Sequence, residues 1–260
     1  MRFRRLVPAV ASLLLAVSVT ACSDGDDASG RPDQAWLEPA LLTVEDLGSG
    51  FQVAPDDERD GGGAPDFGCL FDFDVPGAGQ RDRDNDDGEP EAEFQAVDDP
   101  QLPMVLHSIT DSGDGDKAAE LLQKLGEQTG KCTEVDETDE SGMRWQFDVE
   151  QDEETWAPGA DQQLTVTASG TAALAPMTIP ISFALTIVRT GDVLTFVMFF
   201  DMADDVTDAH RSLVERACER VDAVIAGGPL PDREPLLEDY PIGKFLSDLL
   251  GGTATGPQTA

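Results

Sequence analysis

The fold of this chain is decided by one stretch, Met177-Thr-Ile-Pro-Ile-Ser-Phe-Ala-Leu-Thr-Ile-Val-Arg-Thr-Gly-Asp-Val-Leu-Thr-Phe-Val-Met-Phe-Phe-Asp-Met202. Its first half alternates large apolar residues with small or polar ones, which is the period of a strand with one buried face. Arg189-Thr-Gly-Asp192 predicts a turn, since Gly191 adopts positive φ at little cost. In the second half both faces are apolar, so we expect a central strand covered on both sides. The stretch is a predicted core hairpin and carries no acid, base or nucleophile on its apolar face.

Shorter periodic segments extend this hairpin into a domain. Further strands are predicted at 91–97, 104–109, 143–149 and 164–168, and helices at 114–130 and 206–226. Each helix has an apolar stripe, and Asp204 or Asp205 is the predicted cap of the second one. Strands and helices do not alternate regularly, which argues against a parallel sheet. We therefore expect an α+β fold over residues 36–228, with a single antiparallel sheet of about six strands and two main helices packed on it.

The first 21 residues predict a targeting segment. Three arginines precede an apolar run at 6–19, which is shorter than the roughly 20 residues of a membrane span. Val19-Thr-Ala-Cys22 follows and resembles the lipobox of bacterial lipoproteins, in which the cysteine becomes the lipid-modified N-terminus. This resemblance implies cleavage before Cys22, lipidation of Cys22 and anchoring to the outer face of the cell membrane. The acidic, Gly-containing segment 22–35 is then a disordered tether. The alternative is an ordinary secretory peptide in which Cys22 is incidental.

Charge limits the partners of this protein. The 260-residue chain has 17 Lys and Arg against 52 Asp and Glu, a formal net charge of −35. Like charge repels nucleic acid, so we expect no nucleic-acid partner. With only 2 His and 4 Cys, there is little material for a His-rich metal site. We expect no cofactor, and the Pro-rich tail at 229–260 should wrap the surface or be partly disordered.

Once Cys22 is set aside, Cys69, Cys132 and Cys218 remain. An exported protein experiences an oxidising compartment, so one disulfide is expected and one thiol is left over. Three pairings can form. We favour Cys69–Cys132, because both cysteines lie at the edges of predicted elements, and we expect Cys218 to be a buried free thiol on the second helix.

Catalytic and metal motifs have little support in the sequence. Asp82, Asp84, Asp86 and Glu93 match EF-hand ligand positions, but Asp87 stands where that loop requires glycine. A solvated acidic loop without a metal is the better interpretation. No nucleophile elbow, zinc-protease or phosphate-binding motif is present, and we interpret His107 and His210 as structural. We therefore do not expect an enzyme.

The arrangement resembles a family of actinobacterial lipoproteins whose domain is similar to the extracellular sensor domain of PknH-type serine/threonine kinases. The features that carry the resemblance are the lipobox, the early Leu-Leu-Thr-Val-Glu-Asp-Leu-Gly48, the cysteines at 69 and 132, the late hairpin and the closing helix. A second resemblance is to LpqN-type lipoproteins with a PsbP-like fold. The first implies an antiparallel sheet, a ligand cleft and two disulfides, of which this chain has cysteines for one. Neither resemblance implies catalytic residues.

The functional hypothesis is a ligand-binding or sensing module of the cell envelope; a structural or adhesion protein and an enzyme are the alternatives. Two helical stripes cannot seal both faces of the sheet. We expect either that the helices share one face with a gap between them, or that the tail closes the other face. Such a gap would be an apolar cleft. Because surrounding acids repel anions, the expected ligand is a small neutral or cationic, partly apolar molecule.

Overall fold

The computed structural model describes residues 34–55, 69, 90–97, 102–139, 142–174, 176–232 and 234–243. The predicted signal segment, Cys22 and the acidic residues 82–87 lie outside these ranges. The elements in chain order are η1 (Ala35–Ala40), α1 (Val44–Leu47), β1 (Phe51–Val53), β2 (Glu91–Ala96), β3 (Met104–Asp111), α3 (Gly115–Thr129), β4 (Glu134–Thr138), β5 (Arg144–Asp152), β6 (Gln162–Leu174), β7 (Met177–Thr190), β8 (Val193–Asp201) and α4 (Thr207–Ile225).

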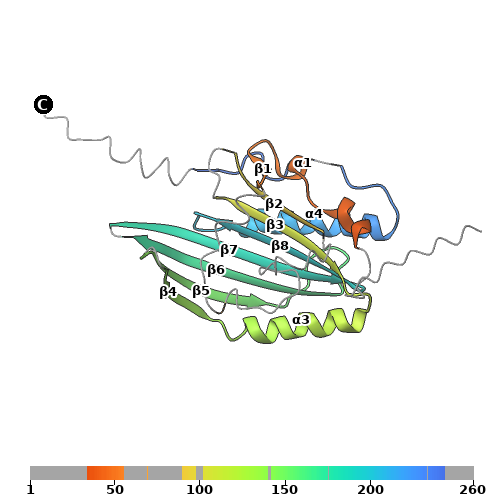
Figure 1. Ribbon diagram of the computed structural model, residues 1–260, viewed down its shortest axis with the longest axis horizontal. Coiled ribbons are helices and arrows are strands. Elements are labelled where there is room, and N and C mark those ends of the chain that lie inside the picture. Colours follow the sequence, from red (N-terminus) through yellow and green to blue (C-terminus); the bar gives the residue numbers. More distant parts are fainter. Residues whose placement is uncertain are drawn as a thin grey trace, which may run out of the picture. The chain divides into compact units, whose positions relative to one another are not determined.

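The strands form one antiparallel sheet in the order β1-β2-β3-β8-β7-β6-β5-β4 (Figure 1). The antiparallel α+β architecture is confirmed, but the expectation of about six strands is wrong, because the described sheet has eight. The two additional strands are the edge strands. β1 is only three residues long, and β4 buries Val135 alone, so neither carries the periodic apolar signal of a longer strand.

The predicted hairpin is the centre of this sheet. β7 and β8 pair from Ser182↔Asp201 to Thr190↔Val193, and Gly191 in the turn has φ 64°. Along β8, Val193 to Val197, Phe199 and Asp201 are buried, which confirms that both faces of this strand are covered.

The two main helices lie on opposite faces of the sheet. α3 packs Leu122 and Leu125 into a cluster with Phe196, whereas α4 packs Leu213 into a cluster with Val197. Neighbouring residues of a strand point to opposite faces, so these two clusters are separated by the sheet. Of the two arrangements expected, the one in which the helices share one face is therefore wrong.

The tail contributes to the α4 face. The N–H groups of Leu236 and Leu237 donate to the carbonyl groups of Asp46 and Leu47, both at 2.8 Å. Leu237 is 3% exposed, and the ring of Tyr240 packs edge-on against Phe199 with 5.3 Å between centroids. This part of the predicted tail at 229–260 is thus an integral part of the core around α1 and α4.

Both helix starts follow from local chemistry. Oδ1 of Asp114 accepts hydrogen bonds from the N–H groups of Asp116 and Lys117, so Asp114 caps α3. The N-cap of α4 is Val206, without a side-chain cap hydrogen bond, so the predicted cap at Asp204 or Asp205 is wrong. Asp205 accepts from the N–H of Thr207 at 2.8 Å, and hydrogen bonds from the Thr207 hydroxyl and then its N–H lower the pKa of the carboxyl group. Among the described helices, none has the length and apolar character needed to cross a bilayer.

Gly170 should be intolerant of any side chain. It lies where β6 approaches β5, and a Cβ at this position would stand 1.8 Å from the carbonyl oxygen of Gln146. Backbone atoms held in the β5–β6 ladder cannot move aside, so Gly170→Ala should lower the free energy of unfolding by about 3 kcal/mol in chemical denaturation.

The matched control is Gly228→Ala, since a Cβ there meets its nearest atom, the carbonyl oxygen of Ala223, at 3.7 Å. This variant should change stability by less than about 0.5 kcal/mol. Equal stability of the two variants would contradict the close approach at Gly170.

Candidate binding surface

The favoured disulfide is present. Cys69 is bonded to Cys132 at the turn between α3 and β4, across a sequence separation of 63 residues, and Cys218 is free and buried. Closing a loop of this length stabilises the fold by roughly 4 kcal/mol in the chain-entropy model. Burial raises the pKa of the Cys218 thiol to about 12, with smaller effects from Asp222 and two glutamates. A thiol with that pKa stays protonated and is a poor nucleophile or metal ligand.

The two histidines are structural elements of the α4 face. His210 is 2% exposed and its Nε2–H donates to the carbonyl of Val197 at 3.1 Å, which fixes α4 on β8. His107 is fully buried, and its Nδ1 accepts from the N–H of Leu42 at 2.9 Å. Burial lowers the pKa of His210 to about 4. Burial, followed by the nearby Arg220 charge, lowers that of His107 to about 3. Both rings are neutral at physiological pH and lack access to a substrate.

A buried charge cluster, which the sequence analysis missed, joins the N-terminal segment to α4. The fully buried carboxylate of Asp46 lies 3.1 Å from Nη1 of Arg216 and 3.3 Å from Nη1 of Arg220. Arg220 also donates to the carbonyls of Pro39 and Ala40. Removing one partner of such a buried pair typically costs about 3–5 kcal/mol, because the remaining charge stays buried. The cluster holds the N-terminal segment against α4. Asp46 and Arg216 lie 170 residues apart in the sequence, so no local sequence pattern predicts their contact.

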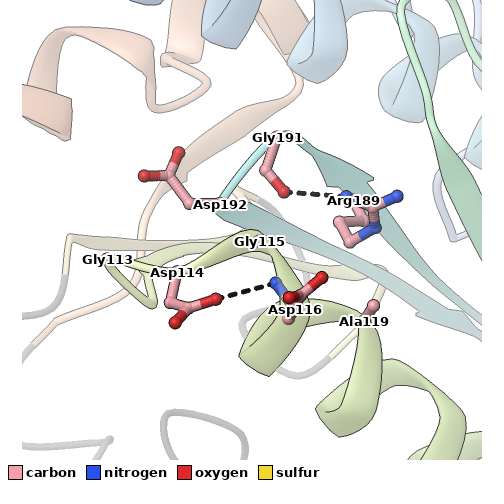
Figure 2. Close-up of a pocket in the computed structure, with 8 residues that line it drawn as sticks. All are labelled: Gly113, Asp114, Gly115, Asp116, Ala119, Arg189, Gly191 and Asp192. Carbon is pink, nitrogen blue, oxygen red and sulfur yellow. Dashed lines mark hydrogen bonds between the residues drawn. The ribbon is translucent and has the colours of Figure 1, made fainter.

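A surface hollow of about 470 Å³ lies between the start of α3 and the β7–β8 turn (Figure 2). Three carboxylates line it, those of Asp114, Asp116 and Asp192, against the single cation of Arg189. Arg189 is fully engaged in holding the turn. It donates to Gln162 and to the carbonyl of Gly191 and lies 3.4 Å from Asp161. The hollow is open and polar, and its chemistry favours a cationic group over an anion.

The second hollow, about 350 Å³, lies on β4, β5 and β6. Glu134, Asp136 and Asp148 contribute acids, and Gln146 and Ser169 contribute neutral polar groups. Neither hollow is the expected apolar cleft. In the part of the chain that the structure describes, no three His, Cys, Asp or Glu side chains are arranged to hold a metal ion. The EF-hand candidates Asp82, Asp84 and Asp86 lie outside the described residues, and Glu93 is in β2.

Comparison with known proteins gives only a distant structural likeness. No protein-family model matches the chain, and no curated protein is similar to it. The extracellular domain of PknH from Mycobacterium tuberculosis is similar in structure, with 14% sequence identity and a TM-score of 0.38. The match covers 69% of this chain and 79% of the PknH domain. A likeness of this size establishes neither a family nor a function.

Because of the two buried histidines, the free energy of unfolding should decrease in mild acid. Their folded-state pKa values are below the unfolded value of about 6.5, so the unfolded chain takes up the protons first as pH falls. The stabilisation is complete above about pH 6.5 and is lost as pH falls toward the folded pKa of His210, about 4. Urea unfolding at about pH 7 and about pH 5 measures this effect. The wild-type free energy of unfolding should fall by about 2 kcal/mol more than that of His210→Gln.

Glutamine keeps an N–H donor for the carbonyl of Val197 but does not titrate, which makes His210→Gln the matched variant. Parallel pH profiles for the two proteins would show that His210 is protonated equally in both states, and the structural argument would fail.

Proposed function

We propose that this protein is an exported, lipid-anchored module of the cell envelope that acts by binding. The observation that carries the proposal is the Cys69–Cys132 disulfide, because such bonds persist in oxidising compartments and are rare in the cytosol. Val19-Thr-Ala-Cys22, with its resemblance to a lipobox, supplies the anchor at Cys22. Residues 23–33 separate that cysteine from the described domain and act as its tether.

Binding is a better proposal than catalysis because the groups that usually perform catalysis are sequestered. His107, His210 and Cys218 are all buried and hold their neutral forms near neutral pH. The accessible polar groups of the described surface are mainly carboxylates. The ligand we propose is a small cationic molecule at the hollow beside α3, which Asp114, Asp116 and Asp192 line. Neither of the two hollows described has the apolar lining that an apolar ligand would require.

The anchor is tested by Cys22→Ala. The wild-type protein should partition with membranes and with the detergent phase, whereas the variant should appear in the soluble fraction, since it lacks the acylated residue. Conversion of Ser23 to Ala, next to the predicted cleavage site, is the control and should remain membrane-bound. A Cys22→Ala protein that still enters the detergent phase would overturn the lipoprotein proposal.

The ligand proposal is tested by thermal shift against a polyamine such as spermidine and against an anion such as citrate. Spermidine should raise the melting temperature of the wild-type chain. Asp116→Asn combined with Asp192→Asn should abolish most of that rise, because two of three carboxylates are neutralised.

The control for net charge is Asp208→Asn combined with Asp204→Asn, two exposed acids at the start of α4, which should leave the spermidine effect unchanged. A shift with citrate instead of spermidine would contradict the charge argument.

A further inference from the structure

Among the described strands, β4 is last in the sheet and pairs with β5 alone, so its other edge is unpaired within this part of the chain. The N–H of Val149 donates to Thr133 and the N–H of Asp139 donates to Met143, both at 3.0 Å. In an antiparallel ladder the pairing residues alternate, so 133, 135, 137 and 139 face β5. The backbone N–H and C=O groups of Glu134, Asp136 and Thr138 therefore point away from the sheet.

These outward groups are accessible along most of the strand. Among the described residues, no backbone group pairs with the outward groups of Asp136 or Thr138, and both side chains are exposed. At the other end, Sγ of Cys69 lies 3.9 Å from the carbonyl oxygen of Glu134 and marks the limit of the edge. β4 contains no proline, and its brevity and three acidic side chains discourage pairing with most strands and favour a basic one. Its backbone can accept another strand.

The charges on this edge select the strand that it can accept. Asp136 is neutralised by Arg144, whose Nη2 lies 2.6 Å from its carboxylate. Glu134 lies directly across from Asp148 in β5, and like charges in this position are unfavourable. Within the described part of the chain, neither of these two carboxylates has a cation beside it. A lysine or arginine on an added strand, opposite Glu134, would lie next to Glu134 and on the same face of the sheet as Asp148.

We infer that β4 is a docking edge for an extended, basic peptide segment of a partner protein, which adds as a further strand. Backbone pairing to Glu134, Asp136 and Thr138 provides the register, and basic side chains on the face of the sheet that carries Glu134 and Asp148 provide the selectivity. The polar hollow over β4, β5 and β6 receives the basic side chain opposite Glu134.

A second copy of this chain is a poor occupant of the same edge. Pairing two β4 strands would bring the acids of both edges together, and each chain carries a formal net charge of −35. Repulsion between like charges opposes that association and leaves cationic partners favoured.

This inference rests on the proposed binding role and names its partner class. The probe is a fluorescent Lys-Val-Lys-Val-Lys-Val-Lys peptide, titrated into the purified full-length chain and followed by anisotropy. We expect saturable binding. Thr138→Pro, which removes one outward N–H without touching the ladder to β5, should weaken binding about tenfold. Glu134→Lys should weaken it at least as much by reversing the selecting charge.

Two controls separate strand addition from attraction by charge alone, and a third checks folding. Glu154→Lys makes the same charge change outside β4 and should leave affinity within about twofold of wild type. A peptide N-methylated at alternate residues keeps its charge but loses the pairing edge and should bind about tenfold more weakly. Circular dichroism melts establish that each variant is folded.

Different results of these experiments would overturn the docking edge, assign it to a second copy, or leave only the proposed binding role. Equal affinity of Thr138→Pro and wild type, or of the methylated and plain peptides, would overturn the inference, as would absence of binding up to about 1 mM peptide. A wild-type dimer by light scattering that Thr138→Pro converts to monomer would assign the edge to a second copy instead. Spermidine binding beside α3 without peptide binding would leave the proposed binding role intact and remove only this edge.

Discussion

The structure depends on the two apolar faces of β8. Val197 and Phe199 point to one side of the sheet, and Leu194 and Phe196 point to the other. Full burial of side chains of this size stabilises a fold by about 1.5–3 kcal/mol each, so neither face can be left in water. A two-layer domain covers only one face of its sheet. This chain therefore places α3 on one face and α4 on the other. The N-terminal segment and the tail complete the cover on the α4 face.

The N-terminal segment and the tail help α4 to cover its face of the sheet. α4 alone is too narrow to cover β2, β3, β8 and β7, and the chain supplies Leu42 and Leu47 from the start of the domain and Leu237 from its end. Asp46 then introduces a charge into this layer, and Arg216 and Arg220 of α4 compensate it. A buried ion pair contributes little net stability, but it restricts the register in which the N-terminal segment can lie on α4.

The elements with strong local signals could be predicted from the sequence. The hairpin turn at Gly191, the cap at Asp114 and the apolar stripe around Leu122 and Leu125 all reflect periodicity within a few residues. The faces to which the helices pack could not be predicted, because an apolar stripe does not state which side of a sheet it meets. β4 was missed because four of its five side chains are exposed. The candidate surface was missed for the same reason, since its acids are indistinguishable in the sequence from the many solvated ones.

The contacts between the tail and the segment around α1 determine the order in which the core of the domain can be completed. Leu236 and Leu237 bond to the backbone of α1, and Glu238 accepts hydrogen bonds from the N–H and hydroxyl of Ser49, 189 residues earlier in the chain. A chain that is delivered from its N-terminus, whether by a ribosome or through a secretion channel, can bring α3 and its face of the sheet together first. The α4 layer has to wait for the last described residues. Until then, one apolar face of an almost complete sheet is incompletely covered. In this interval, binding by a chaperone or aggregation competes with folding.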